Sequence, residues 1–286
     1  MRLARAAAVA AATTAVMTGT ALAASAITGG QVDSGNLHPN VALIAFYGEG
    51  GLSSCTASLV SPTVLLTAGH CTAAATGTVA VTFDWHIADA PPVPFPVAAD
   101  KQRGYTPEEV EAAGFRPGTA HTHPQFSGFT DPRNWNDVGV VVLDAPVADI
   151  PTVSLAPKNY LNEFTPDVLN RTLFEIVGYG TEVRQAESGP QKPLPQPFPL
   201  VRRFGEAPGQ KLTDQVLQVN GNENDPRGDG GSCLGDSGGP AFHGGYQVTV
   251  TSYSLTPNCR YIAGLQRVDI PVVQGWLATF EVAPDH

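Results

Sequence analysis

The sequence predicts an all-β fold, an antiparallel barrel or sandwich, that ends in a single helix. The first observation is a series of short runs rich in β-branched and aromatic residues, bounded by many of the chain's 30 glycines and 25 prolines. The second is that no long amphipathic helical pattern separates these runs. Many short strands at turn-separated intervals favour antiparallel sheets. The expected strands cover residues 41–46, 56–60, 64–67, 79–83, 138–143, 174–177, 216–219, 247–252 and 261–268.

The first 26 residues predict a signal peptide (1–26). Arg2 and Arg5 give a positive start, residues 6–16 form a short apolar run, and a small-x-small triplet ends at Ala26. The apolar run is too short to span a bilayer, and no later segment is long and apolar enough to do so. We therefore expect a secreted protein cut after Ala26, with the alanine-rich leader typical of a bacterium. A cut after Ala23 would leave a tripeptide to be trimmed.

Charge and cysteine content limit the classes of partner. The formal net charge is −10, and removing the leader with its two arginines takes it to −12. Such an acidic chain argues against nucleic acid or an anionic membrane as partner. Four cysteines in an exported chain predict two disulfides, although the sequence alone leaves three pairings open.

Two regions and the C-terminus complete the expected architecture. Residues 88–128 and 189–199 are rich in proline, glycine or charge and are interpreted as surface loops, although a proline-rich run can also bind a partner in an extended conformation. Asp269 is expected to cap a terminal helix that has Pro271 in its first turn. Its apolar face would pack against the sheets and comprises Val272, Val273, Trp276, Leu277 and Phe280.

The run 233–240, Cys-Leu-Gly-Asp-Ser-Gly-Gly-Pro, is the first sign of chemistry. The hydroxyl of Ser237 becomes nucleophilic only when a neighbouring base takes its proton. Gly235 and Gly238 allow a sharp turn, so the amides of Gly235 and Ser237 are expected to point at one spot and stabilise an oxygen that gains negative charge. The carboxylate of Asp236 would need a cation in such a turn. The alternative is a glycine-rich surface turn that happens to hold a serine.

A base and a group that orients it are expected in the first half of the chain. His70 follows an apolar run, and a neutral imidazole can take the serine proton and return it to a leaving group. Asp137 opens the apolar run 138–143, so its carboxylate is expected to be partly buried and therefore paired, with an imidazolium as a suitable partner. The alternatives are a structural histidine at a strand end and an aspartate that starts a strand.

Motifs in the order His, Asp, Ser carry a family resemblance. Thr-Ala-Gly-His-Cys ends at Cys71, and Gly-Asp-Ser-Gly-Gly-Pro ends at Pro240. With Asp137 between them, the chain resembles the trypsin/chymotrypsin-like serine proteases from residue 27 to about residue 280. The resemblance implies one protease domain, 27–286, made of two antiparallel six-stranded β-barrels with the active site between them. The first barrel is expected over about 27–150, and the second, with the terminal helix, over about 151–286.

The resemblance assigns a role to each motif residue. It implies His70 as general base and acid, Asp137 as the group that holds its tautomer and stabilises the imidazolium, and Ser237 as the acyl acceptor. The amides of Gly235 and Ser237 would form the oxyanion hole. The implied activity is that of a secreted serine endopeptidase with a polypeptide substrate and without cofactor or metal. We expect a monomer, with neither nucleic acid nor a membrane as partner.

The resemblance also implies supporting features. It pairs Cys55 with Cys71 and Cys233 with Cys259. Ser252 corresponds to a serine that supports the catalytic aspartate and begins the strand that pairs with substrate. The segment 177–180, Val-Gly-Tyr-Gly, resembles the one that opens the second barrel, which makes the proline-rich run a surface loop following it.

The same resemblance predicts how the chain is activated. A new N-terminal amine at Ile27 would fold inward and pair with Asp236, because a buried carboxylate without a cation is costly. No propeptide is evident, so we expect signal peptidase itself to release Ile27.

The expected specificity pocket lacks a carboxylate at its base. It comprises Gly231 and Ser232 before the nucleophile and Ser252 and Ser254 on the wall, where Ser254 replaces a usual glycine. Asp229 is expected to lie outside its floor. The sequence therefore predicts an uncharged residue, small to medium or hydrophobic, before the cleaved bond (the P1 residue) rather than Lys or Arg.

Two other functions compete with this interpretation. A non-catalytic binding protein on the same fold would generally lack a triad member, yet all three are present. An esterase of the α/β-hydrolase type would need a Gly-x-Ser-x-Gly elbow and the order Ser, Asp, His, and neither occurs. The pair His121 and His123 lacks a third ligand, so we expect a surface loop rather than a metal site.

Overall fold

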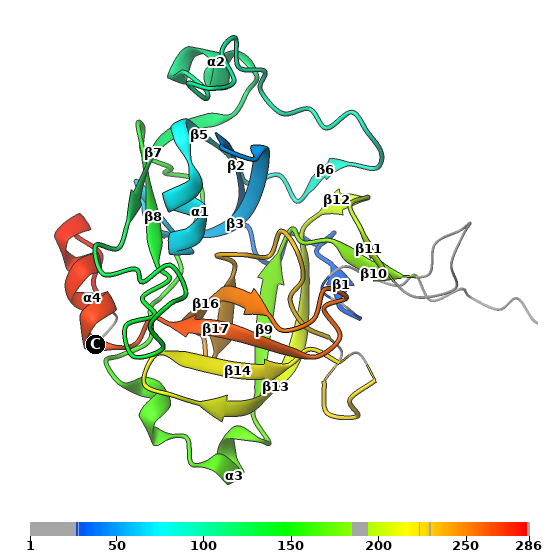
Figure 1. The fold of residues 1–286 in the computed structure, drawn as a ribbon, viewed down its shortest axis with the longest axis vertical. Helices are drawn as coiled ribbons and strands as arrows, with labels where there is room; N and C mark the ends of the chain where they lie inside the picture. Colours follow the sequence, from blue (N-terminus) through cyan, green and yellow to red (C-terminus); the bar gives the residue numbers. More distant parts are fainter. Residues whose placement is uncertain (1–26, 28, 185–193, 223, 229, 285–286) are drawn as a thin grey trace, which may run out of the picture.

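The computed structural model describes residues 27, 29–184, 194–222, 224–228 and 230–284. It contains two closed six-stranded antiparallel barrels, one above the other in Figure 1. The first barrel has the strand order β2-β3-β4-β8-β7-β5. Its strands are β2 (Val41–Gly48), β3 (Gly51–Ser61), β4 (Val64–Thr67), β5 (Thr76–Thr82), β7 (Arg116–Thr122) and β8 (Gly139–Leu143).

The second barrel has the strand order β13-β14-β17-β16-β15-β9, and pairing of β13 with β9 closes it. Its strands are β9 (Leu173–Gly178), β13 (Arg203–Leu212), β14 (Val216–Asn220), β15 (Pro240–His243), β16 (Tyr246–Ser254) and β17 (Ile262–Arg267). The predicted all-β class is thus confirmed, and each of the nine expected strands overlaps an observed one.

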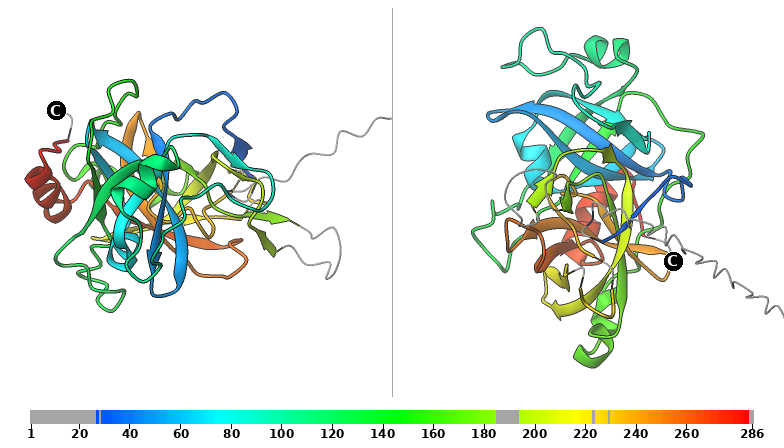
Figure 2. Two further views of the ribbon diagram at one scale, coloured as in Figure 1. Left: turned by 90° about the horizontal axis from the view of Figure 1, so that it is seen from above. Right: turned by 90° about the vertical axis from the view of Figure 1, so that its right-hand side faces the viewer.

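Each barrel has its own apolar interior, and the two ends of the chain tie the barrels together. The short strand β1 (Gln31–Val32) pairs with β13 of the second barrel. Helix α4 (Pro271–Leu277), continued by the 3-10 turn η2 (Ala278–Phe280), packs instead beside the first barrel, where Val273 and Leu277 share a buried cluster with Leu66 of β4 and Val140 of β8. Figure 2 shows this helix at the edge of the molecule.

The helix is confirmed, but its expected cap is wrong. Ile270 occupies the cap position and makes no side-chain capping bond. Asp269 is drawn inward because Arg267 lies within 2.8 Å of its carboxylate and the backbone N–H of Leu161 donates to it at 2.8 Å. A buried carboxylate is tolerated only when it is paired, and Arg267 supplies the partner. Asp269 is therefore held in the interior and does not cap the helix.

The expected loop over 88–128 is wrong where the segment forms a helix and a strand, and the rest of it is irregular. Helix α2 (Pro107–Ala112) begins with a capping box, in which Thr106 accepts from the amide of Glu109 and the Glu109 carboxylate accepts from the amide of Thr106. Strand β7 follows it. Gly118 lies within this strand, although glycine is more typical of a turn. A Cβ on Gly118 would lie 2.7 Å from a methyl group of Val141, so the glycine allows close packing inside the barrel.

His121 and His123, expected on a surface loop, lie on or directly after β7 and face the terminal helix. The rings of His121 and Phe280 are 5.4 Å apart, and those of His123 and Trp276 are 5.0 Å apart. Both histidines therefore belong to the contact between the first barrel and the chain's end.

The remaining elements are short. They are β6 (His86–Ala88), η1 (Tyr160–Glu163), α3 (Pro166–Leu169), β10 (Glu182–Arg184), β11 (Leu194–Gln196) and β12 (Leu200–Val201). Of the proline-rich run, residues 189–193 lie outside the described residues, and β11 in its second half pairs with β10. Within the described ranges, no helix has the length and apolar character needed to cross a membrane.

Candidate active site

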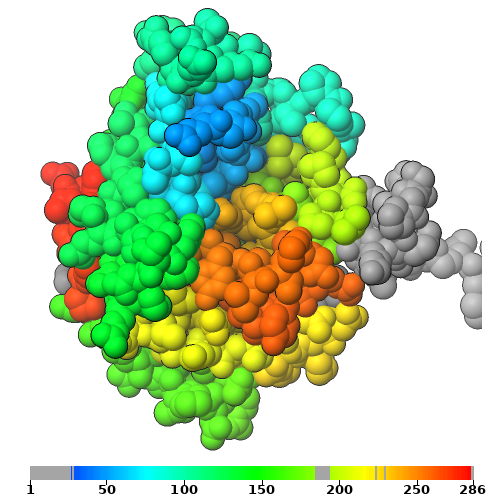
Figure 3. Space-filling view, in the orientation of Figure 1, coloured from blue at the N-terminus to red at the C-terminus, as the bar shows by residue number. Residues whose placement is uncertain are grey.

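The three motif residues meet where the barrels face each other. His70 is the second residue of α1 (Gly69–Ala74), which begins two residues after the end of β4, and Asp137 lies two residues before the start of β8. Because β4 and β8 are paired, with Thr67 opposite Gly139, these two strand ends are neighbours. Ser237 stands in the turn before β15, on the second barrel. In Figure 3 the surfaces of these regions, cyan for α1, green for the segment before β8 and gold for the turn before β15, gather on one face of the molecule.

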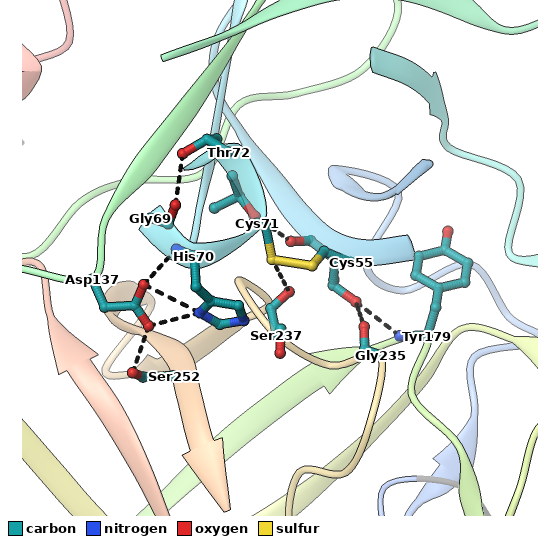
Figure 4. The surroundings of a disulfide bond; sticks show 12 residues. Cys55, Gly69, His70, Cys71, Thr72, Asp137, Tyr179, Gly235, Ser237 and Ser252 are labelled. Atoms are coloured by element: carbon teal, nitrogen blue, oxygen red, sulfur yellow. Dashed lines mark hydrogen bonds and ion pairs between the residues drawn. A yellow bond between two sulfur atoms is a disulfide. The ribbon is translucent and has the colours of Figure 1, made fainter. Parts of the chain in front are cut away.

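The imidazole of His70 is bonded to a buried carboxylate. Its Nδ1 lies 2.9 Å from Oδ2 of Asp137, and the backbone N–H of His70 donates to Oδ1 at 2.7 Å. Asp137 is fully buried, whereas a quarter of the His70 side chain is exposed. Because an ionised carboxylate only accepts, Nδ1 carries the proton and Nε2 is the free acceptor. Figure 4 shows the ring between Asp137 and Ser237.

Gly69 allows α1 to approach the segment before β8 closely. A Cβ on Gly69 would lie 3.0 Å from both the N and the O of Val138, and 3.2 Å from Oδ1 of Asp137. A larger residue would require these neighbours to move by a few tenths of an ångström. Glycine before the histidine therefore favours the close contact between His70 and Asp137.

The serine turn is held by both barrels. Thr56 of β3, in the first barrel, makes two hydrogen bonds to this turn. Its backbone N–H donates to the carbonyl of Ser237 at 2.8 Å, and its hydroxyl donates to the carbonyl of Gly235 at 2.9 Å. The amide of Gly238 donates to Thr251 of β16 at 2.8 Å. Gly235 has φ of +99°, a region that strains side-chain-bearing residues.

The turn leaves its reactive groups available. Among the described residues, the amides of Gly235 and Ser237 donate to no acceptor, and no hydrogen bond joins the Ser237 hydroxyl to His70. Catalytic hydrogen bonds are often long before a substrate binds. The arrangement offers a nucleophile, a base beside it and two free amide donors.

Ser252 donates from its hydroxyl to Oδ2 of Asp137 at 2.6 Å, as the resemblance implies. Two residues not singled out from the sequence complete the surroundings of this acid. The indole N–H of Trp135 donates to the Ser252 hydroxyl at 2.9 Å, and the backbone N–H of Asp137 donates to Oε1 of Gln266 at 3.1 Å. Neither contact follows a spacing rule, because Ser252 and Gln266 lie more than a hundred residues beyond Asp137.

A cavity of about 310 Å³ adjoins Ser237, and its described lining contains no charged side chain. Ser252 and Ser254, two of the expected pocket residues, line it. Ser232 lies behind it, buried, and its carbonyl accepts from the Ser254 hydroxyl at 3.3 Å. The lining residues are Cys233, Leu234, Ser237, Thr251, Ser252, Tyr253, Ser254, Leu255, Thr256, Pro257 and Cys259.

Gly231, the remaining expected pocket residue, is not among the residues that line this cavity. Gly231 packs against the backbone of Gly221, where a Cβ would come within 2.2 Å of the Gly221 Cα. Asp229, expected outside the pocket floor, lies outside the described residues.

Both residues of the expected activation pair are buried, and no contact between them is present among the described residues. Asp236 is fully buried, and its carboxylate accepts from the amides of Gly180 at 2.7 Å and Cys233 at 2.8 Å. Burial raises the pKa of Asp236 to about 6, although these two donors and the charge of Arg203 act to lower it. The side chain of Ile27 is buried in the core of the second barrel.

Both expected disulfides are present. Cys55–Cys71 joins β3 to α1, next to His70, and Cys233–Cys259 closes the far side of the cavity. The pairing of Cys55 with Cys71 and of Cys233 with Cys259 is thus confirmed. Each bridge fixes the backbone beside one of the catalytic candidates.

Comparisons with known proteins agree with this geometry. A family model described as Trypsin matches residues 27–276. No curated protein sequence matches the chain.

Three solved structures share the fold at low identity. An HL collagenase is 16% identical, with a TM-score of 0.55, over 86% of this chain and 94% of its own. A protein named GrC is 19% identical, with a TM-score of 0.60, over 88% of this chain and 98% of its own. The human heparin binding protein is 18% identical, with a TM-score of 0.56, over 90% and 99%. At such identities the likeness shows the fold alone.

Proposed function

The chain belongs to the trypsin family, and we propose that it is a secreted serine endopeptidase acting through an acyl-enzyme on Ser237. The observation that carries the proposal is the 2.9 Å contact between His70 Nδ1 and the buried Asp137, which leaves Nε2 free on the side of Ser237. A structural histidine would not need its second nitrogen aimed at a serine.

The chemistry follows from the placement of the protons. Nε2 of His70 takes the proton of the Ser237 hydroxyl as the oxygen attacks the substrate carbonyl carbon. Asp137 stabilises the imidazolium and holds its orientation. The imidazolium then protonates the departing amine, which leaves an ester on Ser237. A water molecule, activated by the same nitrogen, hydrolyses that ester and restores the enzyme.

The oxyanion is proposed to bind the amides of Gly235 and Ser237. These donors are fixed before the reaction because Thr56 holds two carbonyls of the same turn. Donors that need no reorganisation stabilise developing charge more strongly than water does.

The proposed P1 residue is uncharged, and either small to medium or hydrophobic. The cavity beside Ser237 has no charged side chain among its described lining, so a lysine or arginine would be desolvated without a partner. The hydroxyl of Ser254 bonds to the carbonyl of Ser232, which ties β16 to the segment before the nucleophile and limits the space between them.

Activation is proposed to require a free amine on Ile27. Asp236 is buried with two amide donors but a raised pKa, so the pocket favours an additional cation. The segment that follows Ile27 is anchored, because Asp33 and Arg202 form a fully buried ion pair with 2.8 Å between Oδ2 and Nε. Cleavage after Ala26 would supply the amine beside an already seated side chain.

A fluorophosphonate probe tests the catalytic proposal on purified secreted protein. We expect one covalent label per chain, lost in Ser237→Ala. Labelling that persists in that variant, or that is missing from folded protein whose N-terminus is Ile27, contradicts the catalytic proposal.

N-terminal sequencing of labelled protein tests activation, since residues remaining before Ile27 in active enzyme would refute the proposed role of the Ile27 amine. A peptide library tests specificity, where cleavage mainly after Lys or Arg would refute the uncharged P1.

A further inference from the structure

The surroundings of Asp137 contain a contact that the proposed mechanism does not use. We infer that Trp135 is a positioning residue, whose indole N–H fixes the direction of the Ser252 hydroxyl and thereby the hydrogen bonding of Asp137. The inference rests on the proposed function, because Asp137 must orient His70 for Trp135 to matter in catalysis.

The direction of the hydrogen bonds follows from the chemistry of the groups. The indole nitrogen of Trp135 can only donate, and it lies 2.9 Å from Oγ of Ser252. That hydroxyl has one proton, which can go to Oδ2 of Asp137 at 2.6 Å, an atom that only accepts. With the indole as donor on one side, the hydroxyl must present its proton to the carboxylate. Without the indole, it could rotate toward another acceptor.

The left-handed backbone of Asn136 allows Trp135 and Asp137 to contact the same serine, Ser252. Asn136 stands between Trp135 and Asp137 and has φ of +42°, a conformation that asparagine tolerates better than most residues. Its side-chain amide donates to the carbonyl of Gln125 at 3.2 Å. The turn brings the side chains on either side of Asn136 to the same Ser252 hydroxyl, although Ser252 comes from the other barrel.

Aromatic contacts hold the indole in place. The ring of Trp135 lies 5.2 Å from that of Phe129 and 5.5 Å from that of Tyr253, and Phe129 lies 5.5 Å from the His70 ring. These rings cover the side of the triad where the loop before β8 meets β16. Exclusion of water strengthens the hydrogen bonds among Trp135, Ser252 and Asp137, since a lower local dielectric strengthens each of them.

A double-mutant cycle separates this role from simple packing. Trp135→Phe keeps an aromatic ring but removes the donor, and Ser252→Ala removes the hydroxyl. We expect Trp135→Phe to lower kcat roughly 3- to 10-fold, the effect of one neutral hydrogen bond, with little change in KM. Trp135→Phe should have no further effect in the Ser252→Ala background, because the indole acts only through that hydroxyl. The matched control is Trp276→Phe, the same change at a ring that packs on His123 and, among the described residues, donates to neither Ser252 nor Asp137, and it should leave kcat unchanged.

A readout besides activity keeps the inference apart from the proposed function. The NMR resonance of the proton between Nδ1 of His70 and Asp137 should shift in Trp135→Phe and in Ser252→Ala. The double variant should show the same resonance as Ser252→Ala alone. Replacing Trp135 with benzothienylalanine, which keeps the ring shape and lacks the N–H, should reproduce the shift. Additive effects on kcat and on this resonance would overturn the inference. Failure of fluorophosphonate labelling with the resonance still coupled to Trp135 would instead refute the proposed function alone.

Discussion

Two fully buried aspartates lie near the nucleophile, and their surroundings differ in one respect. Asp137 accepts from the His70 ring, the His70 amide and the Ser252 hydroxyl, so a potential cation is already at hand. Among the described residues, Asp236 accepts from two backbone amides and from no side chain, and burial raises its pKa to about 6. The first site is complete as the chain folds, whereas the second favours a cation that cleavage would supply. Under the proposed function, catalysis and its control therefore use separate carboxylates.

The largest expected effect is at the complete site. Asp137→Asn should lower kcat about 10⁴-fold, because an amide can donate to Nδ1 and so favours the wrong tautomer of His70. Steady-state kinetics on mature enzyme measure this. Stability should change far less, and a loss of kcat explained by unfolding, seen by circular dichroism, would mean that Asp137 is structural.

The next effect is at the incomplete site and should differ between the precursor and the mature enzyme. In mature enzyme, Asp236→Asn should lower kcat roughly 10²- to 10³-fold, the cost of a disordered oxyanion donor. In a chain that keeps residues before Ile27, the same substitution should stabilise the fold at neutral pH, since it removes a buried charge whose desolvation exceeds the stabilisation from its surroundings. Equal losses of stability in both forms would contradict the switch.

The pH dependence of the unprocessed chain sharpens this comparison. The pKa of Asp236 is raised in the folded state, so the unfolded state loses its proton first as pH rises. The free energy of unfolding should therefore fall between about pH 4 and pH 6, on the order of 3 kcal/mol. Urea denaturation of Ser237→Ala precursor measures it, and the fall should be absent when Asp236→Asn is added.

His123 should give the opposite trend. Burial lowers its pKa, and its Nδ1 already accepts from the amide of Gln125 at 3.2 Å. The unfolded state therefore binds a proton more readily, and this contribution to stability is lost as pH falls below about 6.5. His123→Asn should reduce the acid-side loss in the same urea experiment while leaving the Asp236 trend in place.

The smallest effect concerns specificity rather than rate. Ser254→Gly should widen the cavity beside Ser237, because it removes the hydroxyl that bonds to Ser232. The ratio of kcat/KM for phenylalanine over alanine at P1 should rise roughly 10-fold. An unchanged ratio would show that other residues set the size of the pocket.

Local signals account for what the sequence could predict. Strands with continuous apolar runs, such as β4 and β8, and glycine-rich turns such as the one around Ser237 require particular residue types, so they stand out in a single chain. The sequence does not predict strand β13, because Gly205, Pro208 and several polar residues interrupt its pattern of apolar residues. Gly209 is required there by the close approach of α3, because a Cβ on Gly209 would lie 2.6 Å from the carbonyl oxygen of Leu169.

Long-range side-chain contacts were beyond such prediction. Asp269 has the composition of a helix cap, yet Arg267 holds it in the interior. Trp135 reaches a serine 117 positions away in the sequence. These partners are chosen by the packing of two barrels, and neither residue type nor spacing encodes them.

The acyl-enzyme itself gives the most direct measurement. Mature protein is mixed with an activated ester of a short alanine peptide, quenched in acid within the first turnover and mapped by mass spectrometry. The account predicts the acyl group on Ser237, and none on Ser237→Ala. Consumption of the ester with the acyl group on another residue, or with no acylated protein at any quench time, would contradict it.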